Sequence, residues 1–215
     1  MKPVSAWAAL ALVAATVGAV EISEARLERR TLADPAAAVA ELAGSGPTWL
    51  AWTAPGAGES TQACCFRRGW KERGCTLGGR DQGWGTSSNW PRLPGSDLLI
   101  LAEIDRGRPL RLRAVGSGCP IDGNGRRVVA LDGVDPARSV DLLLRWARDP
   151  SSPEDVLDPA LLGILAHDLP DVALRVVALA EDAKLPIRIR KQALFWLADS
   201  GDPRALDEIE KILER

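Results

Sequence analysis

The chain has 215 residues, which is enough to bury a substantial hydrophobic core in one compact unit or in two small domains. Its 27 basic and 29 acidic side chains leave a formal net charge of −2. This balanced composition gives no electrostatic basis for binding nucleic acid or an anionic membrane surface, so both classes of partner are excluded. The local basic stretches Arg26–Arg30 and Arg106–Arg113 are interpreted as solvated strand faces rather than as sites for a polyanion.

The first residues have the layout of a secretory signal peptide. Met1 and Lys2 form a short basic start, and Val4–Val20 follows as about 17 residues without a charge. Val17 and Ala19 stand at −3 and −1 of a cleavage site, which predicts a signal peptide at 1–19 and an exported, periplasmic or extracellular protein. The alternative, an uncleaved membrane anchor, is disfavoured because a spanning helix needs roughly 20 apolar residues. We therefore expect no membrane association after the signal is removed.

The segment 21–149 is predicted to form an α+β domain. Charges at alternate positions of Glu21–Leu32 indicate an exposed or edge strand. Asp34-Pro35 and Asp135-Pro136 each predict the start of a helix, because Asp caps a helix N-terminus and Pro fits the first turn. Four further segments are predicted strands, at Thr48–Thr53, Leu98–Ile104, Leu110–Val115 and Arg126–Leu131. The turn sequence Asp105–Pro109 indicates that the second and third of these strands form a hairpin.

The least regular stretch, Ala54–Ser96, is rich in Gly and Trp and holds three of the four cysteines. An even number of cysteines behind an export signal predicts structural disulfides. Adjacent cysteines rarely bridge each other, so two pairings stay open: Cys64–Cys75 with Cys65–Cys119, or Cys65–Cys75 with Cys64–Cys119. A four-thiolate zinc site and a thiol–disulfide enzyme are rival interpretations, and both are disfavoured by the absence of a Cys-x-x-Cys spacing.

Few other side chains suggest chemistry, and we predict no catalytic residue, no metal ligand and no cofactor. His167 is the only histidine, and we expect it at a helix end or on the surface, where the helix dipole favours its charged form. Neither Ser96 nor Ser117 lies in a Gly-x-Ser-x-Gly elbow, so a Ser–His mechanism is not indicated. Three tryptophans fit either a recognition surface or packing on disulfides, and they are Trp70, Trp84 and Trp90.

The last segment, 150–215, is predicted to be helical and self-similar. When Leu161–Ile212 is shifted by 32 residues, apolar positions fall on apolar positions. The matched pairs are Leu162/Leu194, Leu165/Leu197, Ala166/Ala198, Ala173/Ala205, Leu174/Leu206 and Val177/Ile209. Each copy has a helix–turn–helix pattern with an apolar stripe that needs a neighbour to bury it, which is typical of stacked helical repeats. Asp158-Pro159 and Asp202-Pro203 are predicted as two more helix starts.

One stretch of this segment, Arg190–Leu206, reads RKQALFWLADSGDPRAL. It resembles the signature of bacterial exported HEAT-repeat domain-containing proteins, most strongly over 186–215 and more weakly over Val156–Lys184. The resemblance implies a short α-solenoid of the armadillo type that binds other proteins and has no single defined activity. We therefore expect an α+β domain at 21–149, followed by an all-α, HEAT-like helical-repeat domain at 150–215.

The expected function is that of an exported, non-enzymatic module for protein–protein interaction. Its candidate binding face is a polar stripe formed by Arg188, Arg190, Lys191 and Gln192. The alternative interpretation is that these side chains simply form a solvated helix face. The partner is predicted to be another protein, and the polar outer side of the last helix, Pro203–Arg215, favours a monomer. The alternative function is a thiol- or metal-dependent activity centred on Cys64, Cys65, Cys75 and Cys119.

Overall fold

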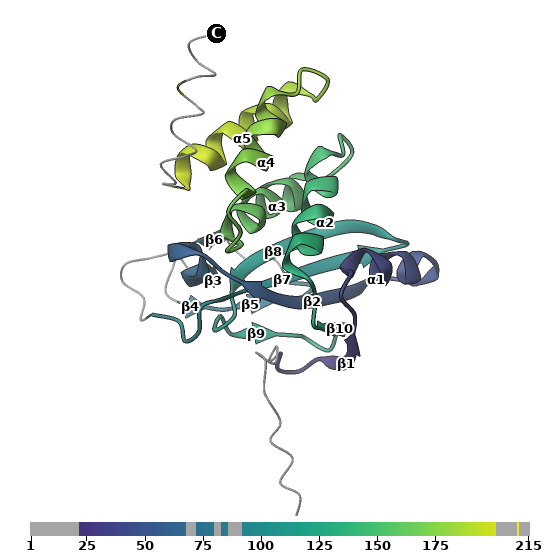
Figure 1. The fold of residues 1–215 in the computed structure, drawn as a ribbon. Helices are drawn as coiled ribbons and strands as arrows, with labels where there is room; N and C mark the ends of the chain where they lie inside the picture. The colour runs from purple at the N-terminus through teal and green to yellow at the C-terminus, as the bar shows by residue number, and fades with distance from the viewer. Residues whose placement is uncertain (1–21, 68–71, 80–82, 86–91, 201–209, 211–215) are drawn as a thin grey trace, which may run out of the picture.

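A computed structural model describes residues 22–67, 72–79, 83–85, 92–200 and 210 (Figure 1). The predicted signal segment, 1–19, lies outside the described residues. The helix start at Asp202-Pro203 and nearly all of the last predicted helix also lie outside them, as do Trp70 and Trp90.

A five-stranded mixed sheet with the strand order β1-β10-β2-β7-β8 forms the centre of the molecule. Its strands are β1 Arg26–Thr31, β2 Thr48–Pro55, β7 Asp97–Asp105, β8 Arg108–Gly116 and β10 Arg127–Asp132. β10 runs parallel to both β1 and β2, whereas β2, β7 and β8 are antiparallel. The predicted β7–β8 hairpin is confirmed, and Arg106 and Gly107 in its turn have positive φ angles of 50° and 76°, which suit a two-residue hairpin loop.

Two helices begin where the Asp-Pro pairs predict them. In α1, Pro35–Glu41, Asp34 Oδ1 accepts a hydrogen bond of 2.9 Å from the backbone N–H of Ala36. In α2, Pro136–Arg148, Asp135 Oδ1 accepts one of 3.0 Å from the backbone N–H of Arg138. Two short 3₁₀ helices, η1 at Leu42–Gly44 and η2 at Gly58–Gln62, follow α1 and β2.

Among the described residues, three more helices follow α2: α3 at Glu154–Ala166, α4 at Val172–Glu181 and α5 at Ile187–Asp199. The predicted start at Asp158-Pro159 is wrong, because Pro159 lies inside α3. The helix begins after Pro153 instead, and its first turn carries the acidic side chains of Glu154 and Asp155. These charges interact favourably with the positive end of the helix dipole, which is a start signal of the same kind as an aspartate cap.

The predicted fold class is wrong in its second half, because the C-terminal helices do not form an all-α solenoid. α3 packs on β8 and α2, and α4 and α5 pair with each other beyond it, away from the sheet (Figure 1). α3 lies close to both α2 and the sheet at Gly163, where a Cβ atom would lie 3.1 Å from Leu143 and 3.3 Å from Ala114 and Ile100. One continuous hydrophobic cluster extends from the sheet to Leu197 in α5.

The apolar pattern of α3 explains the error. An amphipathic repeat helix has one apolar stripe, whereas a helix that is apolar on most sides is enclosed between layers. α3 is of the enclosed kind, and its buried residues are Val156, Leu157, Pro159, Ala160, Leu161, Gly163, Ile164 and Ala166. α3 therefore packs mainly on β8 and α2, with smaller contacts to α4 and α5.

The irregular part of the chain covers the opposite face of the central sheet. It forms a three-stranded sheet of order β4-β3-β6 and a two-stranded parallel sheet of β5 and β9. The bounds are β3 Cys64–Arg67, β4 Glu72–Arg73, β5 Cys75–Thr76, β6 Gly83–Gly85 and β9 Ile121–Asp122. Side chains from alternate positions of the central strands pack with the cysteines in a second hydrophobic cluster. Both faces of the sheet are thus covered. In the part of the chain that the structure describes, none of the helices has the length and hydrophobicity that a bilayer crossing requires.

Candidate functional site

The four cysteines form two disulfides, Cys64–Cys119 and Cys65–Cys75. This is the second of the two pairings that the sequence left open. All four side chains are buried, with exposed fractions between 0 and 3%. In this oxidised form the sulfurs are covalently paired, and the apolar cluster around them includes Leu77. The bridges join β3 to β5 and to the segment between β8 and β9, so they have the properties of structural cross-links within the layer that covers the central sheet.

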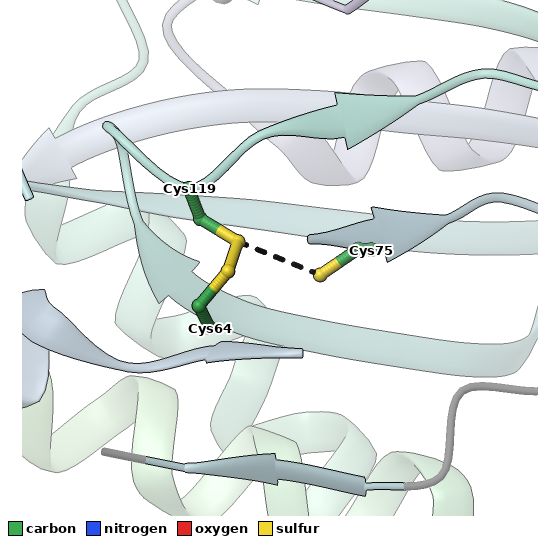
Figure 2. Close-up of side chains that lie close together, drawn as sticks. All are labelled: Cys64, Cys75 and Cys119. Carbon is green, nitrogen blue, oxygen red and sulfur yellow. Dashed lines mark hydrogen bonds between the residues drawn. A yellow bond between two sulfur atoms is a disulfide. The ribbon is translucent and has the colours of Figure 1, made fainter. Parts of the chain in front are cut away.

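The two disulfides contact each other, as Figure 2 shows for the side chains of Cys64, Cys75 and Cys119. The Sγ atoms of Cys75 and Cys119 are 3.8 Å apart, and the Sγ atoms of all three residues lie within 4.8 Å of one another. Bonded sulfurs carry no hydrogen, so the contact is a van der Waals contact between two bridges. The fold therefore brings the sulfur of Cys119 close to those of Cys64 and Cys75, although Cys119 is distant from both in sequence.

The contact is not arranged for exchange between the disulfides. A thiolate of Cys75 in line with the Cys119–Cys64 bond would lie roughly 5.8 Å from Cys64 Sγ, the sum of the contact and an S–S bond of about 2.0 Å. The observed separation is at most 4.8 Å, so Cys75 approaches the bond from the side. This geometry favours a structural role for the bridges over thiol–disulfide chemistry.

A second buried polar group lies on the helix side of the sheet and contains the only histidine. His167 is the C-cap of α3, so the predicted position at a helix end is confirmed, but its side chain is 1% exposed and the alternative of a surface position is wrong. Its Nδ1 lies 2.6 Å from the carbonyl oxygen of Gly163, and its Nε2 lies 3.0 Å from Ser139 Oγ. Trp52 Nε1 donates to the same Ser139 Oγ at 2.8 Å. Together these bonds link β2, α2 and α3.

The directions of these hydrogen bonds follow from the donor capacity of each group. A carbonyl oxygen only accepts, so His167 Nδ1 carries the proton and donates to Gly163. Nε2 of the neutral ring then accepts from the hydroxyl of Ser139, which in turn accepts from Trp52. Burial lowers the pKa of His167 below its ordinary value, although the bond to Gly163 opposes this effect. The expectation of a charged histidine is thus replaced by a neutral, buried one.

This Ser–His contact does not form a nucleophilic centre. The serine is Ser139, rather than Ser96 or Ser117, and it is fully buried. The hydroxyl proton is directed to His167 Nε2, as in a catalytic pair, but the carboxylate that would orient a catalytic histidine through Nδ1 is replaced by the Gly163 carbonyl. The group therefore acts as a buried polar link between layers.

The polar stripe predicted as a binding face is largely engaged within the protein. Arg188 donates to the carbonyl oxygens of Pro150 and Ser152 at 3.4 and 3.2 Å, and Arg190 donates to that of Ala180 at 2.9 Å. The contacts of Arg190 satisfy a carbonyl in the last turn of α4. Lys191 is exposed.

Gln192 faces Asp158, which lies half-buried between α3 and α5. Burial raises the pKa of Asp158, and hydrogen bonds from Trp196 and Gln192 oppose that rise. The two helices therefore meet through a polar contact at this point, in addition to their apolar contacts. Of the four stripe residues, Lys191 is the one fully turned to solvent.

Sequence reasoning did not single out the exposed apolar side chains of α4 and α5. Leu174 is 54% exposed, Ile187 60% and Phe195 55%. Phe195 also packs edge-on against Trp196, with ring centroids 5.2 Å apart. A signal was present in the sequence for two of them, because Leu174 and Phe195 fall between the buried positions of their helices, but the repeat interpretation assigned Leu174 to a buried stripe. Of the Gly-rich region's tryptophans, Trp84 has its backbone paired with Cys65 across β6 and β3.

Comparison with known proteins gives no match: no family model fits the chain, and no curated protein or solved structure is significantly similar to it. The resemblance of Arg190–Leu206 to HEAT-repeat proteins therefore stays a prediction.

Proposed function

We propose that the protein is an exported, non-enzymatic binding module whose α4–α5 pair contacts another protein. The observation that carries this proposal is the exposure of Leu174, Ile187 and Phe195 on this pair. Large apolar and aromatic side chains release free energy when a partner removes them from water, and they recur as anchors of protein interfaces. Lys191 on the same helix as Phe195 supplies a charge of the kind found at an interface rim.

The position of the α4–α5 pair supports this role. The pair lies on the outer side of α3, farthest from the sheet, so one of its faces is bound to the core and the other is turned outward (Figure 1). The core side holds Val176, Ala193 and Leu197, which are fully buried. The pair rests on α3, which in turn packs on β8 and α2.

The chemistry of the described residues supports binding over catalysis. The one histidine is buried and engaged in hydrogen bonds, and the four cysteines are paired as disulfides. Export is supported by these disulfides, which persist in oxidising compartments, and by the signal-like pattern of residues 1–19.

The proposal can be tested by site-specific photo-crosslinking in the exported fraction of the native host. A photoreactive phenylalanine analogue replaces Phe195 in one variant and Leu27, which is 40% exposed on β1, in a control variant. We expect one discrete protein adduct from position 195 and none from position 27. Equal labelling from both positions, or no adduct from position 195, contradicts the proposal. A Phe195→Ala variant that keeps the wild-type stability should retain less of the captured partner.

A further inference from the structure

We propose that the reduced form of this protein binds one Zn²⁺ ion through the thiolates of Cys64, Cys75 and Cys119, with Cys65 as the fourth ligand. The proposal goes beyond the binding function of α4 and α5, because it concerns the opposite side of the sheet. It rests on the positions of the sulfur atoms, on the backbone that holds them, and on their surroundings.

The sulfur positions match a thiolate zinc site. Zinc binds thiolates at about 2.3 Å in a tetrahedron, which places neighbouring sulfurs about 3.8 Å apart. The Sγ atoms of Cys75 and Cys119, which belong to different disulfides, are 3.8 Å apart, and Cys64 completes a triangle in which no separation exceeds 4.8 Å (Figure 2). Once the bridges open, Cys64 and Cys119 have only to separate to that spacing around the ion.

Backbone hydrogen bonds hold the cysteines together independently of the disulfides. Cys75 N–H donates to the carbonyl of Pro120 at 2.9 Å, which joins its strand to the residue after Cys119. Gly74 N–H donates to the carbonyl of Cys65 at 2.9 Å, which joins β3 to the segment before Cys75. Cleavage of the S–S bonds leaves these contacts in place, so the thiols are preorganised and little ordering entropy opposes metal binding.

The surroundings select the class of ion. The cysteines are 0 to 3% exposed and lie in an apolar cluster with Leu77 and Ile121. Soft thiolates in a dry site favour Zn²⁺ over Mg²⁺ or Ca²⁺, which require oxygen ligands and retain water. Reduction of the Cys65–Cys75 bridge frees the Cys65 thiol next to Cys75, so Cys65 is the fourth ligand once its side chain turns towards the other two sulfurs.

The reaction balances with a dithiol or phosphine reductant. Each disulfide takes up two electrons and two protons and gives two thiols. A dithiol supplies both and is oxidised to its own disulfide, whereas a phosphine supplies the electrons and is oxidised to its oxide by water, which provides the oxygen atom and the two protons. Zinc then replaces the thiol protons, which leave to solvent. The disulfide form and the zinc form use the same four sulfurs and exclude each other, so oxidation of the zinc form releases the ion.

The test uses the purified protein, reduced under anaerobic conditions with a phosphine, and Co²⁺ as a spectroscopic probe before Zn²⁺. We expect sulfur-to-cobalt charge-transfer absorption that Zn²⁺ abolishes, one zinc per chain in native mass spectrometry, and no uptake by the oxidised protein. Zinc should also raise the Tm of the reduced protein. Cys75→Ser and Cys119→Ser should each weaken zinc binding by more than about tenfold, whereas Ser117→Ala, the matched control, should leave it unchanged.

Near-UV circular dichroism of the tryptophans reports whether each sample is folded. A reduced protein that keeps the native spectrum and takes up no zinc overturns the proposal. A reduced protein that loses the spectrum and does not regain it with zinc overturns it as well. Equal zinc affinity in the wild type and in both cysteine variants would show that the ion binds elsewhere.

Discussion

Removal of the Ser139 hydroxyl should be among the most destabilising small changes in the helix layer. In Ser139→Ala, Trp52 Nε1 loses its acceptor and His167 Nε2 loses its donor, and all three side chains are buried. A buried polar group that loses its partner costs about 1–3 kcal/mol. Two such groups predict a loss of about 2–6 kcal/mol, while the volume removed is only one oxygen atom. This is a large share of the total stability of a single domain, which is typically about 5–15 kcal/mol.

The assay is equilibrium unfolding in urea with the disulfides intact, followed by tryptophan fluorescence. Ser96→Ala is the matched control, because Ser96 is exposed and a surface change of this kind stays within about 0.5 kcal/mol. Ser139→Ala should shift the midpoint to lower urea at an unchanged slope. If its midpoint coincides with that of Ser96→Ala, the three hydrogen bonds do not link the layers as the geometry indicates.

The same site makes stability depend on pH. Burial lowers the pKa of folded His167, whereas the unfolded chain titrates near the ordinary value of about 6.5. The unfolded state therefore binds more protons between the two pKa values, and acid favours unfolding in that window. The stabilisation is fully present above pH about 6.5, is lost as the pH falls towards the folded pKa, and changes no further below it. His167→Gln should flatten this part of the profile, and a variant profile as steep as the wild type's contradicts the assignment.

The other predictions concern the cross-links and a helix cap. The sequence separations of the two disulfides are 55 for Cys64–Cys119 and 10 for Cys65–Cys75, so loop-closure entropy predicts costs of about 4 and about 2.7 kcal/mol for the respective double Cys→Ala variants. Calorimetry should give the lower Tm for the variant that lacks Cys64–Cys119 and the higher Tm for the variant that lacks Cys65–Cys75. The reverse order would refute the entropic argument. Asp135→Ala removes the cap of α2 and should cost about 1 kcal/mol in urea unfolding; a cost near zero would show that the hydrogen bond to Arg138 N contributes little.

Local structure in the N-terminal part was predictable because its signals are local. The strand expected at Leu98–Ile104 is β7, Asp97–Asp105, and the strand expected at Leu110–Val115 is β8, Arg108–Gly116. Apolar runs and a turn sequence determine both elements and the hairpin between them. The parallel pairing of β10 with β1 and β2 joins segments far apart in sequence, and no short-range pattern reports it.

The burial of His167 depends on such long-range contacts too. The end of β2 crosses the end of α3, where Asp168 N–H donates to the Pro55 carbonyl at 2.9 Å and Ala57 N–H to the Ala166 carbonyl at 2.8 Å. From the sequence alone, a lone histidine at a helix end is expected to be exposed. A usable signal existed in Ser139, which stands four residues before Leu143 on the apolar face of α2 and therefore required a buried partner.

The disulfide pairing, too, could be predicted only in part, because it depends on long-range contacts. The sequence reduced the possibilities to two, because adjacent cysteines do not bridge each other. The choice between them depends on backbone contacts between segments, such as the bond of 2.9 Å from Gly74 N–H to the Cys65 carbonyl, which brings Cys65 beside the segment of Cys75. Two-residue strands have no periodicity from which such contacts can be derived.

The pairing of β1 with β10 also sets an order in time. A chain that leaves the ribosome or an export channel from its N-terminus presents Arg26 long before Arg127, its partner in the sheet. The bridge between Cys65 and Cys75 can form early, because the two residues are 10 positions apart. Cys64 stays a free thiol beside that disulfide until Cys119, 55 positions later, has emerged. A free thiol beside a disulfide can attack its sulfur atoms and exchange the pairing. Correct oxidation of this protein therefore requires that the later strands fold before this exchange occurs, or that a disulfide isomerase restores the correct pairing.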